Sequence, residues 1–111
     1  MKISDAVRRL VEMLVAEDYD GIEEATRSRR LTADQLRQAV DEYGRELRMP
    51  PEVAFHNFDV NEIEGAIPRE AWVLADLWTV EEGRSDLTLE IRITDTGGEI
   101  YDIEINNLHV L

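Results

Sequence analysis

The sequence contains no cysteine, which excludes disulfide bonds, thiol catalysis and cysteine-bound zinc. It also lacks an apolar run of the roughly 18 residues that a membrane span needs. Residues 1–18 carry Arg8, Arg9 and Glu12 within their apolar pattern, so this stretch predicts an amphipathic helix and not a signal peptide. We therefore expect a cytoplasmic protein with a single domain, residues 1–111.

Basic residues are scarce, above all in the second half of the chain. There are 12 Lys and Arg against 25 Asp and Glu, which gives a formal net charge of −13. Residues 49–111 hold 14 of the acids and only three bases, so this part alone carries −11. Nucleic acids and anionic membranes attract clustered Lys and Arg, which argues against either as a partner. The acidity favours a basic partner protein, and the alternative that it only keeps the protein soluble stays equally open.

The first part of the chain has the apolar spacing of amphipathic helices. One predicted helix begins near Ser4, a residue type that caps helices. Another begins at Thr32, which forms a capping-box pattern with Gln35, and stops at Gly44. A short helical turn between them is expected to be capped by Asp20.

Beyond Pro50 and Pro51 the periodicity changes from helical to strand-like, because neither proline fits inside a helix or a central strand. Residues 45–57 are interpreted as a connector. A half-buried strand is predicted at 58–63, since apolar and polar residues alternate there. Further strands are predicted at 71–80, at 87–93 and at 100–111, the last with an irregularity at Asn106 and Asn107.

Helices that precede strands without alternating with them indicate an α+β fold. We predict two or three N-terminal helices packed on one face of a four-stranded antiparallel meander. The helical part is residues 1–48, the connector and first strand are 49–70, and the remaining three strands are 71–111. Cystatin-like and nuclear-transport-factor-like cones have a similar composition of elements, an analogy that carries no function.

Three stretches resemble the signature of a family of short, mostly bacterial proteins of unknown function. They are YDGIEEATRSRRLTADQLRQAVDEYG at 19–44, DLWTVEEGRSDLTLE at 76–90 and YDIEINNLHVL at 101–111. The resemblance implies an α+β domain and a role near toxin-immunity or defence loci. It brings no established activity, and therefore no catalytic residue or cofactor.

No spacing in the sequence specifies a reaction. The serines lack a nucleophile elbow, and His56 and His109 belong to no metal-binding spacing. The acid clusters around Asp59 and Asp95 do not follow the ligand order of a calcium loop. We therefore expect no enzymatic activity, no cofactor and no metal ion.

Asp76 is unusual because it interrupts an apolar predicted strand, Leu74 to Trp78. A carboxylate buried there would suit a general base. The alternative is a position at a sheet edge or a pairing with Arg84 or Arg92 on a neighbouring strand. Trp72 and Leu74 share its parity, as does Trp78, so the same face suits a pocket, a partner-binding patch or a homodimer contact.

The segment from Glu81 to Asp86 predicts a charged hairpin tip, with Gly83 at a position of positive φ. Such a tip can present acids to a basic cleft in another protein. The residues expected to bind a partner are Trp78, Glu81, Glu82, Arg84 and Asp86.

Together these patterns predict a small acidic binding protein without enzymatic activity, of the type of an immunity protein that inhibits a basic partner. The alternative is a cone-shaped domain whose pocket binds a small apolar ligand or uses Asp76 as a general base. The sequence leaves open whether the protein is a monomer or a homodimer.

Overall fold

The computed structural model describes residues 3–27, 30–98 and 101–110. The helices come first and the strands follow, which confirms the predicted α+β class. In chain order the elements are α1 (Ile3–Val15), α2 (Tyr19–Ala25), α3 (Ala33–Tyr43), β1 (Leu47–Arg48), the 3₁₀ helix η1 (Glu52–His56), β2 (Asp59–Glu62), β3 (Glu70–Thr79), β4 (Gly83–Thr94) and β5 (Asp102–Val110).

The ends of the helices follow local hydrogen bonding. The capping box of α3 forms as predicted: the Thr32 hydroxyl accepts from the Gln35 amide at 3.2 Å, and the Gln35 side chain accepts from the Thr32 amide at 2.9 Å. Gly44, at φ +74°, ends this helix. The predicted short helix is present as α2, but its predicted cap was wrong, because Asp18 caps it by accepting from the Gly21 amide at 3.0 Å and Asp20 lies inside its first turn.

The described residues form a sheet of five antiparallel strands, one more than predicted. The order is β1-β3-β4-β5, and β2 pairs with the same edge of β3 as β1 does. β1 lies opposite Trp78 and Thr79, whereas β2 lies opposite residues 71–74. The additional strand, β1, is only two residues long, too short to show a sequence period.

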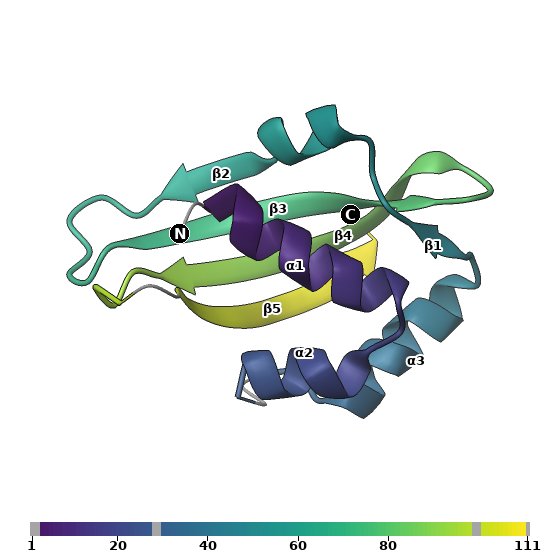
Figure 1. Cartoon of the computed structure of the whole chain (residues 1–111), viewed down its shortest axis with the longest axis horizontal. Helices are drawn as coiled ribbons and strands as arrows, with labels where there is room; N and C mark the ends of the chain where they lie inside the picture. Colours follow the sequence, from purple (N-terminus) through teal and green to yellow (C-terminus); the bar gives the residue numbers. More distant parts are fainter. Residues whose placement is uncertain (1–2, 28–29, 99–100, 111) are drawn as a thin grey trace.

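Helix α1 covers one face of the sheet by lying across the long strands, and α2 and α3 lie beyond β5 (Figure 1). The side chains of β3 alternate accordingly, and every odd-numbered one is buried on the helical face. Strand β4 adds Leu89 and Ile91, both fully buried, to the same core. The opposite face, here called the open face, consists of half-buried side chains on β3 and their cross-strand neighbours, namely Trp72, Leu74, Asp76, Trp78, Glu90 and Arg92.

Two register shifts bend the long strands. Asn106 is an extra residue in β5, because Glu90 pairs with Asn107 and Ile91 with Ile105. This confirms the predicted irregularity. In β4 the segment 85–87 lies opposite Leu77 alone, since Asp76 pairs with Thr88 and Trp78 with Arg84.

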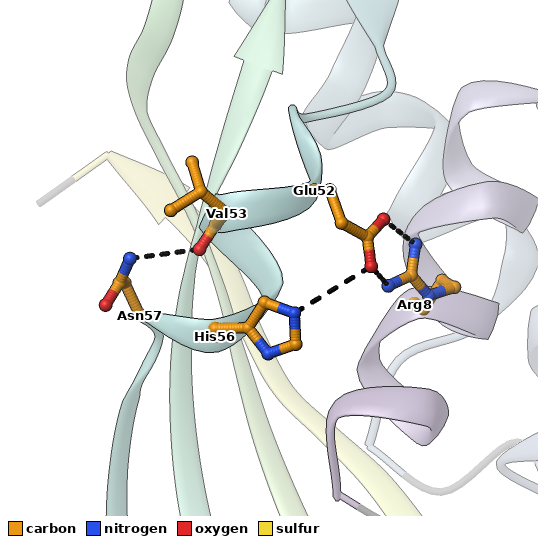
Figure 2. Close-up of polar contacts among 5 residues, drawn as sticks. All are labelled: Arg8, Glu52, Val53, His56 and Asn57. Carbon is orange, nitrogen blue, oxygen red and sulfur yellow. Dashed lines mark hydrogen bonds and ion pairs between the residues drawn. The ribbon is translucent and has the colours of Figure 1, made fainter.

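A bidentate ion pair fixes η1 to α1, as Figure 2 shows. The Arg8 guanidinium donates to both carboxylate oxygens of Glu52, at 2.9 and 2.5 Å, and lies over the Phe55 ring at 4.2 Å. The hydrogen bond from Arg8 lowers the pKa of Glu52. At the other end of η1, the Asn57 side chain donates to the Val53 carbonyl at 3.0 Å.

Leu89→Ala tests whether the helical face of the sheet holds the core. The side chain is fully buried, so its removal is expected to lower the free energy of unfolding by about 2 to 5 kcal/mol in urea titration. Val80→Ala, at a side chain that is 59% exposed, is the control and should change it by less than about 0.5 kcal/mol. Equal effects at the two positions would contradict this assignment of the core.

The Arg8–Glu52 pair predicts a pH effect. The pair lowers the folded-state pKa of Glu52, so its stabilisation is complete above the unfolded value of about 4.3 and is lost as the pH falls through the folded value. In carboxyl NMR titrations, Arg8→Gln should raise the pKa of Glu52 toward its ordinary value. Arg9→Gln, one residue along the same helix, should leave it in place. A Glu52 titration that ignores Arg8 would disprove the pairing in solution.

Candidate functional site

Asp76 lies on the open face, where it has two cross-strand partners. The Thr88 hydroxyl donates to its carboxylate at 3.3 Å, and the Arg84 guanidinium lies 3.6 Å away. Arg92 pairs instead with Glu70 at 2.5 Å. The Asp76 side chain is 43% exposed, so it lacks the burial that the general-base hypothesis requires. Pairing with Arg84 accounts for an acid in this strand.

A cavity of about 200 Å³ opens where η1 crosses the edge of the open face. It brings Asp76, Trp78 and Arg84 together with a wall from η1 and the residues after it. The Arg48 guanidinium packs over the Trp78 ring at 5.0 Å and holds it in place. This space, here called the η1 cavity, is lined by Val53, Ala54, Asn57, Phe58, Asp76, Trp78 and Arg84.

The pocket expected from Trp72, Leu74 and Asp76 is therefore only partly formed. Asp76 lines the η1 cavity, whereas Trp72 and Leu74 lie further along β3 and outside it. The wall formed by η1 could not be predicted from the sequence, because it depends on how the connector folds back over the sheet.

The hairpin between β3 and β4 is shorter than predicted. Its turn is residues 80–82, and β4 begins at Gly83, which has φ +74° and pairs with Thr79. The prediction of a six-residue tip was therefore wrong, because Arg84 and Asp86 already belong to strand β4. Both side chains remain exposed.

The two acids of the turn fasten it to the helical part of the chain. Glu81 accepts from the Glu46 amide at 3.1 Å, next to β1. Glu82 accepts from the Tyr43 hydroxyl at 2.8 Å and from the Thr79 hydroxyl at 3.1 Å. Partial burial, and then the hydrogen bond to Glu82, raise the pKa of Tyr43. The predicted contact acids thus also have a structural role, although each carboxylate is still exposed.

The remaining polar candidates stay apart. In the ranges 3–27, 30–98 and 101–110, no three acidic or histidine side chains come together in a way that could hold a metal ion. The acid cluster predicted around Asp95 includes Glu99, which lies outside the described residues. His56 is 3.9 Å from Glu52, and His109 is 3.4 Å from Glu90.

A second cavity, of about 210 Å³, lies between α1, α2 and β5. Its walls are mostly apolar, and the exposed Arg9 lies at its margin. Its position could not be predicted from the sequence, because its walls come from three separate elements. The lining residues are Ala6, Arg9, Leu10, Met13, Ala25, Tyr101 and Ile103.

Comparison with known proteins supplies a family but no activity. Within the described residues, no helix has the length and apolar content to cross a membrane. Neither the curated proteins nor the solved structures give a match to this chain. Residues 11–111 match the family described as domain of unknown function (DUF7668), in agreement with the expected resemblance to an uncharacterised family. Because this match covers most of the chain, the protein belongs to that family.

Proposed function

We propose that the protein is a small, non-enzymatic binding protein whose acidic sheet half contacts a basic partner protein. The charge balance of residues 49–111 carries the proposal. The three arginines of this part are each paired with a local acid: Arg69 with Glu62, Arg84 with Asp76 and Arg92 with Glu70. Acids such as Glu64, Glu81 and Asp86 have no such partner among the described residues, so the negative field they create is available to another molecule.

The η1 cavity is the part of this surface best suited to receive a side chain. Val53 is 62% exposed at its margin, and Trp78 supplies an aromatic wall. The partly exposed Asp76 carboxylate lies in the same space. An aromatic ring beside a carboxylate suits the apolar stem and charged end of a lysine or arginine. The exposed Glu81, Glu82 and Asp86 would then act at the rim, where charges steer association.

An immunity-type or defence-associated inhibitor in the bacterial cytoplasm is the biological role that we propose for such a protein. An enzyme that binds nucleic acid has a basic cleft, and a compact acidic protein is a suitable occupant of one. The open face, with Trp72, Leu74 and Trp78, is half-buried in the single chain and leaves a monomer or a homodimer as possible forms.

A second candidate function, binding of a small apolar ligand, is favoured by the cavity between α1, α2 and β5. An apolar cavity of about 150 Å³ can bind benzene, and this one has about 210 Å³. Asp76 lies on the other face of the sheet, so this alternative includes no general base.

The basic-partner proposal predicts binding that weakens with salt. A partner captured from the native host should bind at least ten times more weakly at 500 mM than at 50 mM NaCl, because screening removes surface attraction. Asp86→Lys on β4 should weaken binding several-fold in titration calorimetry. Glu24→Lys on α2 makes the same charge change outside the proposed contact and should have a smaller effect. A partner whose affinity ignores salt and both variants would refute the proposal.

The apolar-ligand candidate predicts that benzene shifts the NMR signals of Leu10, Met13 and Ile103, which line the cavity. Ala25→Leu, at an exposed lining residue, should reduce those shifts by filling the entrance. The same substitution at Ala54, in the η1 cavity, is the control. Shifts confined to other residues would eliminate this candidate.

A further inference from the structure

Among the described residues, no strand pairs with the outer edge of β2. The Ile63 amide donates to the Glu70 carbonyl at 2.9 Å, which places residues 63, 61 and 59 in the hydrogen-bonded positions opposite β3. Val60 and Glu62 occupy the alternate positions, so their N–H and C=O groups point away from β3. β1 pairs only with the far end of β3 and does not cover this edge (Figure 1). All four residues of β2 are exposed.

Apolar side chains accompany this free edge. Val60 is 42% exposed, Ile63 41% and Ile67 96%. A cavity of about 140 Å³ adjoins Val60 on the helical side of the sheet, between α1, η1 and β2. A strand added to β2 would direct the side chain opposite Val60 toward this side, because paired residues share a face. The walls of this β2 cavity are Ile3, Ser4, Val7, Phe55, His56, Phe58, Val60 and Val73.

The negative charge along this edge favours a basic partner segment over a second copy of the chain. Asp59, Glu62 and Glu64 are exposed along it, and Arg69 offsets only Glu62, at 3.1 Å. Pairing with the β2 of a second copy would bring two sets of these acids together, and like charges on opposed strands are destabilising. In a basic segment with an apolar residue opposite Val60, that residue would instead meet the cavity, and a lysine or arginine next to it would meet Asp59 on the open face. The edge therefore fits a basic chain better than its own copy.

We propose that β2 binds an extended basic segment of the partner as an added antiparallel or parallel strand, with one apolar side chain seated in the β2 cavity. Main-chain hydrogen bonds at Val60 and Glu62 supply the affinity, and the cavity and the acids supply the selectivity. This inference rests on the proposed basic partner and names where and in what conformation that partner is held.

The test uses the peptide Lys-Val-Lys-Val-Lys-Val-Lys and the full chain. Binding should slow hydrogen exchange of the Val60 and Glu62 amides at least several-fold, measured by NMR. Val60→Pro removes an N–H that points away from β3, and proline is tolerated at such an edge position. It should weaken peptide binding at least tenfold, whereas Val60→Ala, which keeps the N–H, should weaken it no more than about threefold.

Two controls separate strand pairing from general attraction. A peptide of the same sequence, N-methylated at its valines, keeps its charge but lacks the N–H groups that would face Val60 and Glu62, and it should bind at least tenfold more weakly. Far-UV circular dichroism checks whether the Val60→Pro variant is folded. If the variant is unfolded, the hydrogen-exchange measurement on the unsubstituted protein remains the test of strand addition. Equal binding of both peptides, or unchanged exchange at Val60 and Glu62, would overturn strand addition. The basic-partner proposal would survive that result, because its test is the salt and Asp86→Lys response of the host partner.

Discussion

The alternation of side chains along β3 is the constraint on which the rest of this structure depends. A strand places successive residues on opposite faces, so burial of Val73, Ala75 and Leu77 under the helices commits Leu74, Asp76 and Trp78 to the other face. No helix of the described chain covers that face (Figure 1). The open face therefore combines bulky apolar groups with charges, which are partly exposed and contact water as well as neighbours in the sheet.

The bulge in β4 determines which residue pairs with the Asp76 carboxylate. If the register that pairs Asp76 with Thr88 continued without interruption, Arg84 would lie opposite Val80. The two extra residues in β4 place Arg84 opposite Trp78 instead, two positions closer to Asp76, or about 7 Å along the strand. The Ser85 hydroxyl supports this bulge by donating to the Leu77 carbonyl at 2.7 Å and accepting from the Leu87 amide at 3.2 Å. The ion pair on the open face thus depends on a local irregularity of the backbone.

The sequence was sufficient wherever structure follows from near neighbours. The capping box at Thr32, the alternation of β4 and the irregularity at Asn106 are local patterns, and the structure has all three. It was insufficient where distant segments meet. β1 pairs with Thr79 and Trp78, which are distant in the sequence, and Val80 and Glu81 hydrogen-bond to Glu46 beside it. Both cavities beside η1 need a connector to fold back onto α1 and the sheet. All four residues of β2 are exposed, because no helix packs directly on this strand.

The turn between η1 and β2 brings the two proposed contact regions to one edge of the sheet, with the η1 cavity on the open face and the β2 cavity on the helical face. Phe58, directly before β2, lines both the η1 cavity and the β2 cavity, and it packs edge-to-face on Phe55 with the ring centres 5.5 Å apart. Phe55 in turn lies under the Arg8 guanidinium that holds Glu52. The contact of Arg8 on α1 with Glu52 and Phe55 on η1 therefore helps to set the shape of both cavities. A partner that adds a strand to β2 would lie beside the η1 cavity, so a lysine or arginine just beyond that strand would lie near Asp76 and compete with Arg84 for its carboxylate.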